Sequence, residues 1–225
     1  MVQKMDQTLK LGVLISGSGS NLQSIIDNIE KGTLTATIKI VICNNPHAYG
    51  ITRAQKHDLP VAVLKHDNFV TRENFDEELI RILRSNEIDL VVLAGFMRIL
   101  TPVFLKAFPQ KIINIHPALL PSFPGTHGPK DAFEYGVKFS GCTVHFVDEG
   151  IDTGPIIIQS VVPVLQDDTR ETLADRILKE EHRIYPQAIQ YFADRKIIIT
   201  GRKVHIKDSA ETPLIALHNP SLTGF

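Results

Sequence analysis

The chain has 225 residues, of which 43% are hydrophobic and 22% are charged, proportions typical of a soluble globular protein with a sizeable core. Its 24 Lys and Arg residues nearly balance 25 Asp and Glu residues, so the formal net charge is −1 and no overall field attracts nucleic acid or an anionic membrane. No run approaches the roughly 20 apolar residues of a transmembrane helix, and the polar start lacks a signal-peptide pattern, so we expect a cytoplasmic protein.

Short apolar runs alternate with amphipathic segments through the first half of the chain. Each apolar run is predicted to be a buried strand, and these runs are 11–15, 38–43, 61–64, 90–94 and 112–115. The amphipathic segments are predicted to be helices at 21–30, 49–57 and 73–84. Strands with little polar alternation are usually covered by helices on both faces. The pattern therefore predicts an α/β fold with a doubly wound, mostly parallel sheet.

The pattern changes after residue 115. Residues 117–128 form a loop rich in proline and glycine, and loops of this length usually serve a function. Two further strands are predicted at 141–147 and 156–162, separated by the tight segment 148–155.

The C-terminal part begins with a long predicted helix at 169–192. Strands at 196–200 and 203–207 then flank a glycine, which predicts an antiparallel C-terminal hairpin. No linker or repeat divides the chain, so we expect one domain over residues 1–207. The tail, residues 208–225, has no periodicity and is predicted to be loosely ordered.

Cysteine and histidine usage argues against a metal site. The two cysteines, Cys43 and Cys142, lie far apart in apolar runs and are predicted to be buried free thiols. The nine histidines are scattered, without the spacing of metal ligands.

A glycine-rich turn, 16–21, follows the first predicted strand. Its glycines permit close backbone approach, Ser20 supplies a hydroxyl, and the next helix offers free N–H groups, which together favour an anion site. No glycine lies three residues after Gly19, and no acidic residue ends the second strand, so the dinucleotide fingerprint is poorly matched. A single terminal phosphate is the predicted ligand. The alternative is an ordinary turn of glycine and serine.

An amide and an imidazole lie together at the end of the fifth predicted strand. Asn114 and His116 are two residues apart, so their side chains share one face of that strand at its carboxyl end. Such a pair suits a reaction in which a carbonyl becomes a tetrahedral oxyanion and a proton moves. The alternative is an asparagine that satisfies a turn beside a surface histidine.

The segment 145–155 supplies three acidic residues, Asp148, Glu149 and Asp152. A buried carboxylate near His116 would raise the pKa of that histidine towards neutrality. The sequence alone does not decide which acid does so, or whether His145 belongs to the core or to the site.

Four segments occur together in a fixed order: SGSGSNL at 16–22, LAGFMRIL at 93–100, NIHPALLP at 114–121 and HFVDEGIDTGP at 145–155. With them the chain resembles the glycinamide ribonucleotide formyltransferases over about residues 10–205. The resemblance implies a Rossmann-like formyltransferase fold. It also implies, for purine biosynthesis, formyl transfer from the co-substrate 10-formyltetrahydrofolate to the primary amine of glycinamide ribonucleotide, without a metal.

The resemblance assigns catalytic roles to Asn114, His116 and Asp152. Asn114 would hydrogen-bond the formyl oxygen. His116 would act as proton donor and partner of the oxyanion. Asp152 would orient and charge the histidine and help to move protons from the attacking amine.

The same resemblance implies two sets of binding residues. The phosphorylated amine would be held by Gly19, Ser20, Asn21 and Glu181. Folate would be held by an arginine and by a slot whose backbone groups read the pterin ring, at Arg72, Met97, Arg98, Ile99, Leu100 and Asn114. Without the resemblance, 93–100 reads as a strand entering a helix, Arg72 as a surface residue and Glu181 as part of a solvated helix face.

Three rival functions remain. A methionyl-tRNA formyltransferase would carry a further nucleic-acid-binding domain and a basic surface, and a formyltetrahydrofolate hydrolase would carry a regulatory domain before its catalytic part. A non-catalytic nucleotide sensor would not need Asn114, His116 and Asp152 together. We therefore expect small-molecule substrates and no nucleic acid or membrane partner. The sequence does not decide between a monomer and a homodimer.

Overall fold

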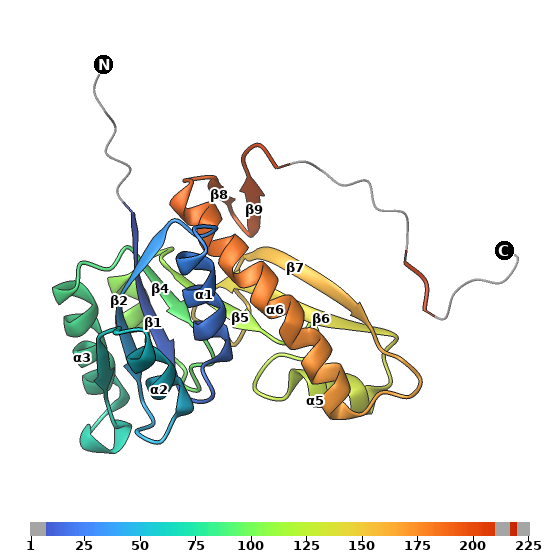
Figure 1. Ribbon diagram of the computed structural model, residues 1–225, viewed down its shortest axis with the longest axis horizontal. Helices are drawn as coiled ribbons and strands as arrows, with labels where there is room; N and C mark the ends of the chain where they lie inside the picture. The colour runs from blue at the N-terminus through green and yellow to red at the C-terminus, as the bar shows by residue number, and fades with distance from the viewer. Residues whose placement is uncertain (1–7, 210–216, 220–225) are drawn as a thin grey trace, which may run out of the picture.

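The computed structural model of the protein describes residues 8–209 and 217–219. Within these residues, nine strands form one sheet in the order β3-β2-β1-β4-β5-β6-β7-β9-β8. Figure 1 shows this sheet with the long helix α6 running across it. None of the helices in the described part of the chain has the length and apolarity needed to cross a bilayer.

The first five strands form the parallel half of the sheet. β1 (Leu9–Ile15) pairs with β2 (Ala36–Cys43) on one side and with β4 (Leu90–Leu93) on the other. β3 (Val61–Val63) extends the sheet beyond β2, and β5 (Ile112–His116) extends it beyond β4. The strand order therefore reverses between β1 and β4, which confirms the predicted doubly wound sheet and opens a crevice at the carboxyl ends of these strands.

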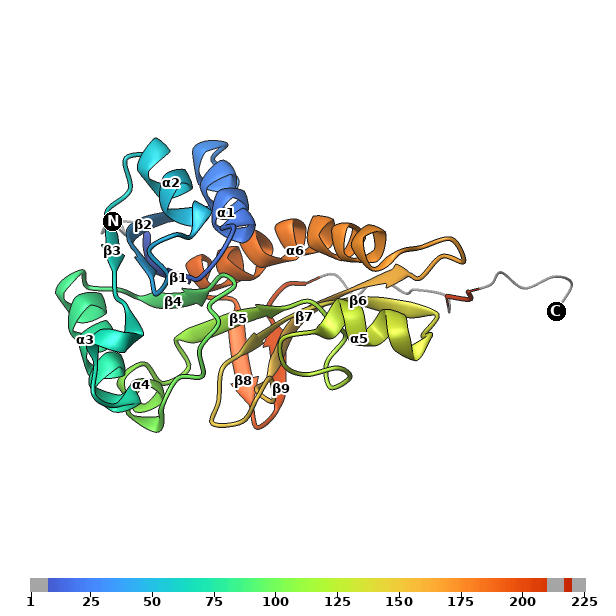
Figure 2. The same cartoon turned by 90° about the horizontal axis from the view of Figure 1, so that it is seen from below.

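Helices cover both faces of the parallel half (Figure 2). α1 (Ser20–Glu30), α2 (Tyr49–Lys56) and α6 (Arg170–Ala193) pack on one face, where they share a hydrophobic core with alternate residues of β1 and β4. α3 (Arg72–Ser85) and α4 (Pro102–Ala107) pack on the other face around a second core. Two separate cores explain why the strands carry apolar side chains on both faces.

The second half of the sheet is antiparallel. β6 (Phe139–Phe146) pairs with β5 and with β7 (Ile156–Pro163). β8 (Ile197–Thr200) and β9 (Lys203–Ile206) form the predicted terminal hairpin, which joins the sheet through one parallel pair between β9 and β7. Both cysteines are buried and free, as predicted.

Three short elements were not predicted: α4, α5 (Gly128–Tyr135) and the 3-10 turn η1 (His66–Asn68). Both helices carry proline in the first turn. The six residues of α4 are too few to show helical periodicity, and α5 begins directly at the end of the proline-rich loop. The predicted tail, 208–225, lies largely outside the described residues. Within it, the Asn219 side-chain amide donates hydrogen bonds to the carbonyls of Lys138 and Val164.

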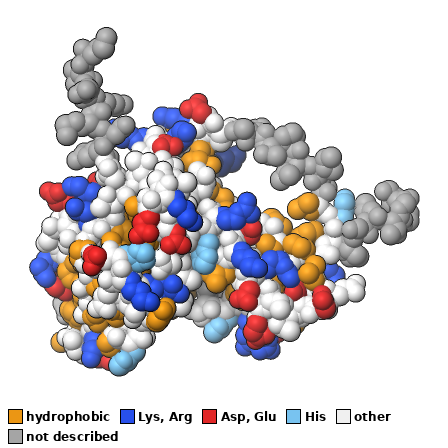
Figure 3. Space-filling view, in the orientation of Figure 1, with side chains coloured by type: hydrophobic (Ala, Val, Ile, Leu, Met, Phe, Trp, Pro, Cys, Tyr) orange, Lys and Arg blue, Asp and Glu red, His pale blue; other side chains and the backbone are white. Residues whose placement is uncertain are grey.

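Charged side chains of both signs are interspersed over the face of the molecule shown in Figure 3. This distribution agrees with the net charge of −1. It gives this face no broad field of one sign.

Helix α6 contains a proline whose lost hydrogen bond is replaced from another helix. Pro186 has no N–H to donate to the carbonyl of His182, one helical turn earlier. The Ser24 hydroxyl of α1 donates to that carbonyl instead, at 2.7 Å. The neighbouring Tyr185 is fully buried, and its hydroxyl lies 3.0 Å from the Leu93 carbonyl and 3.1 Å from the Ile113 carbonyl. Polar contacts thus supplement apolar packing where α6 crosses α1 and the sheet.

We predict that Ser24→Ala destabilises the protein by about 1–2 kcal/mol, because it leaves a partly buried carbonyl without a donor. Urea denaturation measures this loss. The matched control is Ser85→Ala, since Ser85 is exposed and its hydroxyl donates only within its own helix. That variant should cost less than about 0.5 kcal/mol. Equal losses for the two variants would contradict a special role for Ser24.

Candidate active site

The glycine-rich turn lies tightly against the start of α2. Gly19 has a left-handed backbone with φ of 71°, and a Cβ atom added there would lie 2.6 Å from the Cα of Gly50. The Gly50 N–H donates to the Gly17 carbonyl at 3.0 Å, and the Arg53 guanidinium donates to the Ser18 carbonyl at 2.9 Å. With these carbonyls engaged by α2, the N–H groups in the first turn of α1 remain for a ligand.

A cavity of about 250 Å³ lies above this turn, lined by residues 16–21 and by Glu181 among others. Glu181 is only 6% exposed and accepts a hydrogen bond of 2.7 Å from the Asn21 side chain. Burial raises the pKa of Glu181 to about 7, although the bond from Asn21 acts in the opposite direction. The alternative of a solvated helix face at Glu181 is therefore wrong, and Gly19, Ser20, Asn21 and Glu181 line one cavity.

Asp152 lies between two buried histidines. Its Oδ2 atom is 3.4 Å from His116 Nδ1, and its Oδ1 atom is 3.6 Å from His145 Nε2. Asn114 lies opposite His145 in the pairing of β5 with β6, and its Nδ2 atom is 3.2 Å from His145 Nε2. The structure thus brings Asn114, His116 and Asp152 together and adds His145, which the sequence left open.

These contacts indicate the tautomers of the two histidines. The Asn114 amide donates to His145 Nε2, so His145 Nδ1 carries the hydrogen that is donated to the Phe146 carbonyl at 2.8 Å. His116 Nε2 donates to the Phe123 carbonyl, also at 2.8 Å. An amide nitrogen carries two hydrogens, so Asn114 keeps one for a ligand.

The protonation of this group differs from the expectation that a carboxylate raises the pKa of His116. Asp152 and the Phe123 carbonyl do raise it, but His116 is 2% exposed and burial outweighs them, so its pKa is lowered overall. Burial by itself raises the pKa of Asp152. The nearby His145, the hydrogen bond from Gly125 and the nearby His116 together outweigh burial and hold the Asp152 pKa below its usual range. At neutral pH the pair is therefore a carboxylate beside a neutral imidazole.

Asp152 also fastens the proline-rich loop, since its Oδ2 atom accepts a hydrogen bond of 2.8 Å from the Gly125 N–H. Two polar residues that the sequence did not single out hold the same loop. The Thr143 hydroxyl donates to the Ala118 carbonyl at 2.7 Å, and the Gln159 amide donates to the Leu120 carbonyl at 2.9 Å. Only the pairing of β5, β6 and β7 brings them near, which no sequence pattern signalled.

The other acidic residue of the turn, Asp148, serves the turn itself. Its Oδ1 atom accepts hydrogen bonds from the Gly150 N–H at 3.2 Å and the Thr153 hydroxyl at 2.6 Å. Of the acidic side chains in 145–155, Asp152 is the one within ion-pair distance of both site histidines.

Residues 97–101 form an irregular loop between β4 and α4, so the alternative of a strand running directly into a helix is wrong. Met97 and Ile99 are 63% and 59% exposed, whereas Leu100 is buried. The Arg98 guanidinium lies over the Phe75 ring, 4.6 Å from its centroid, and the Arg72 guanidinium donates to the Ile99 carbonyl at 2.7 Å. The structure therefore places five of the six residues predicted to bind folate in or against this loop. The sixth, Asn114, lies on β5 beside His145.

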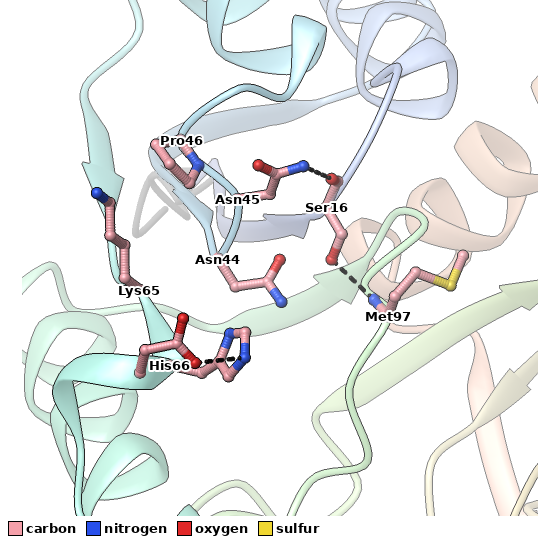
Figure 4. A pocket seen from close by; sticks show the side chains of 8 residues that line it. Ser16, Asn44, Asn45, Pro46, Lys65, His66 and Met97 are labelled. Atoms are coloured by element: carbon pink, nitrogen blue, oxygen red, sulfur yellow. Dashed lines mark hydrogen bonds and ion pairs between the residues drawn. The ribbon is translucent and has the colours of Figure 1, made fainter.

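A second polar cavity, of about 510 Å³, shares Ser16 and Met97 with the first (Figure 4). Its other lining residues follow β2 and β3 and are Asn44, Asn45, Pro46, Lys65, His66 and Asp67. The Ser16 hydroxyl accepts a hydrogen bond of 2.8 Å from the Met97 N–H, and so ties the glycine-rich turn to the 97–101 loop. In the described residues no three His, Cys, Asp or Glu side chains group as metal ligands.

The chain is similar in sequence to known formyltransferases. Residues 9–189 match the family model described as formyl transferase. Phosphoribosylglycinamide formyltransferase of Escherichia coli is 41% identical over 189 residues, which cover 84% of this chain and 89% of that protein. The trifunctional purine biosynthetic protein adenosine-3 of Drosophila melanogaster is 45% identical over 193 residues, which cover 85% of this chain but 14% of that protein.

Solved structures agree with this relation. The crystal structure of glycinamide ribonucleotide transformylase 1 from Symbiobacterium toebii is 46% identical and superposes with a TM-score of 0.89, covering 92% of this chain and 98% of that one. The phosphoribosylglycinamide formyltransferase structure from Anaplasma phagocytophilum is 42% identical, with a TM-score of 0.84. The matched segment contains the glycine-rich turn, the 97–101 loop and the Asn114, His116 and Asp152 cluster, and the chain therefore belongs to the formyl transferase family.

Proposed function

We propose that the chain transfers a formyl group from 10-formyltetrahydrofolate to the primary amine of glycinamide ribonucleotide, a reaction of purine biosynthesis. The observation that carries the proposal is the cluster of Asp152, His116 and Asn114 at the same carboxyl edge of the sheet as the cavity above the glycine-rich turn. The names of the relatives support the same reaction. We further propose that residues 1–207 act as one catalytic domain on small molecules in the cytoplasm.

At the formyl carbon, the reaction forms one bond and breaks another. The substrate amine attacks this carbon, and the carbonyl oxygen becomes an oxyanion. The intermediate then collapses, the bond from carbon to the folate nitrogen breaks, and that nitrogen takes up a proton while the former amine loses one. The protein must stabilise the oxyanion and move one proton.

Three side chains supply these needs. Asn114 retains one amide hydrogen for the formyl oxygen, since its other hydrogen is donated to His145. Asp152 is a carboxylate near neutral pH and takes part in removing the proton from the attacking amine. His116 accepts a proton next to this carboxylate, which stabilises the imidazolium, and donates it to the developing intermediate. The His116 Nε2 hydrogen leaves the Phe123 carbonyl when it turns to the substrate.

The phosphorylated substrate occupies the first cavity. Its phosphate accepts hydrogen bonds from the first turn of α1, and Glu181 with Asn21 binds the polar sugar edge. The pterin of the co-substrate lies against the 97–101 loop, with Arg72 at its outer end. Amine-dependent loss of formyl from 10-formyltetrahydrofolate tests this proposal, whereas equal turnover in buffer alone would favour a hydrolase.

We predict that His116→Ala lowers kcat by about 100-fold or more, because an acid–base group is lost. Steady-state formyl transfer measures the effect. His205→Ala is the matched control, since His205 is exposed on β9, and it should retain nearly full activity. A His116 variant with near-normal kcat would remove this residue from the mechanism.

We predict that Ser20→Asp raises KM for glycinamide ribonucleotide by about tenfold or more and changes KM for folate far less, because it places a negative charge in the anion site. Ser20→Ala, which removes the hydroxyl without adding charge, should have the smaller effect. Equal increases of both KM values for Ser20→Asp would argue against the phosphate assignment.

We predict that Glu181 makes stability depend on pH. Its pKa in the folded protein, about 7, lies above the ordinary 4.5, so the folded state holds this proton more tightly and stability falls as pH rises through that interval. From about pH 5 to about pH 8, the free energy of unfolding measured by urea denaturation should fall by roughly 1–3 kcal/mol more for the unaltered protein than for Glu181→Gln. The same pH dependence in both proteins would show that Glu181 is not the responsible group.

A further inference from the structure

Helix α3 holds the 97–101 loop through its first two turns. The Arg72 guanidinium donates to the Ile99 carbonyl at 2.7 Å, and the Phe75 ring packs against Arg98. One turn further, Asp76 Oδ2 accepts a hydrogen bond of 2.6 Å from the Thr101 N–H. Two of these contacts are hydrogen bonds to the backbone on either side of Leu100.

These two hydrogen bonds fix both peptide planes that flank Leu100. Within the described residues the cis peptide bond is Leu120–Pro121, so both peptide bonds at Leu100 are trans. In a trans peptide, the C=O and the N–H point in opposite directions. Because the Ile99 carbonyl faces Arg72, the Leu100 N–H points away from α3. Because the Thr101 N–H faces Asp76, the Leu100 carbonyl also points away from α3.

Leu100 therefore presents one donor and one acceptor side by side, on the side of the loop opposite to α3. Its own side chain is buried, and within the described residues neither backbone group is hydrogen-bonded to protein. A donor next to an acceptor matches the edge of a flat heterocycle that carries an acceptor next to a donor, as an aminopyrimidinone ring does.

We infer that Asp76 is a positioning residue for folate: it sets the Leu100–Thr101 peptide so that the Leu100 carbonyl faces the heterocycle of the co-substrate. The inference rests on the proposed function. Asp76 is 3% exposed and lies under the loop, so it acts on the ligand through the loop rather than by contact. No residue predicted from the sequence plays this part, since Asp76 reads there as one more polar position of a helix.

The cost of burying a carboxylate supports this role. Burial raises the pKa of Asp76, while the hydrogen bonds from Thr101 and the nearby Arg98 and Arg72 act to lower it. A buried acid is expensive unless it is hydrogen-bonded. Here the Thr101 N–H, which compensates the buried carboxylate, belongs to the 97–101 loop. Arg72 donates a hydrogen bond to the same loop, and Arg98 is part of it.

The experiment compares Asp76→Ala with Asp76→Asn. Alanine removes the acceptor, whereas the asparagine Oδ1 can still accept from Thr101. Asp76→Ala should raise KM for 10-formyltetrahydrofolate by about tenfold, the size expected when a buried donor is left unpaired. KM for glycinamide ribonucleotide should change less than about twofold, and Asp76→Asn should recover most of the loss. Hydrogen exchange at the Thr101 N–H should accelerate in Asp76→Ala only.

A control variant distinguishes a specific rise in KM for folate from a general loss of stability. Asp168→Ala removes an ion pair with Arg176 that contacts neither the cavities nor the 97–101 loop, so it should lower the denaturation midpoint without a change in KM for folate. If Asp76→Ala does not accumulate as folded protein, Asp76→Asn and Asp76→Ser carry the same test, because serine is too short to reach the Thr101 N–H.

The inference is overturned if both KM values rise together, or if Asp76→Asn is as defective as Asp76→Ala. It is also overturned if folate KM stays unchanged while exchange at Thr101 accelerates. These results leave the proposed function intact, because the unaltered protein would still transfer formyl. If the unaltered protein transfers no formyl from 10-formyltetrahydrofolate, the proposed function is wrong and the inference falls with it.

Discussion

The parallel pairing of β4 between β1 and β5 is the constraint on which the rest of the structure depends. It brings three loops to one edge of the sheet: the glycine-rich turn after β1, the 97–101 loop after β4 and the proline-rich loop after β5. On one face, Tyr185 of α6 packs over the junction between β4 and β5, and its hydroxyl lies within hydrogen-bonding distance of a carbonyl of each strand. A shift of β4 by one residue would turn its side chains over and separate these loops.

Electrostatics at this edge follow from how each acid is paired. Asp152 faces two histidines and the Gly125 N–H, so its pKa is low although the side chain is largely buried. Glu181 has one amide partner, Asn21, and burial raises its pKa. The two carboxyl groups thus differ in charge state near neutral pH: Asp152 is ionised, whereas Glu181, with a pKa of about 7, is protonated about half of the time. A charged Asp152 suits proton transfer, and protonation of Glu181 reduces the negative charge near a bound phosphate.

Helices on the two opposite faces of the sheet position different loops of the site. On one face, Gly50 and Arg53 of α2 donate hydrogen bonds to carbonyls of the glycine-rich turn, which leaves the N–H groups of the first turn of α1 for a ligand. On the other, α3 takes up the carbonyl of Ile99 and the N–H of Thr101 and so orients Leu100. In both cases a helix engages one side of a peptide and leaves the other side to the ligand.

The sequence by itself determined the strand–helix alternation, the doubly wound sheet and the terminal hairpin, because apolar periodicity and turn residues are local properties. Most of the proposed site residues came instead from the resemblance carried by four motifs in a fixed order. Without the family resemblance, the residues could not choose Asp152 over Asp148, since both lie in one acidic turn and only the fold brings one of them to His116. Nor could the sequence give the lowered pKa of His116, the raised pKa of Glu181 or the contacts of His145, Thr143 and Asp76. Those depend on burial and on partners that are distant along the chain, and such contacts exist only after the sheet has closed its layers.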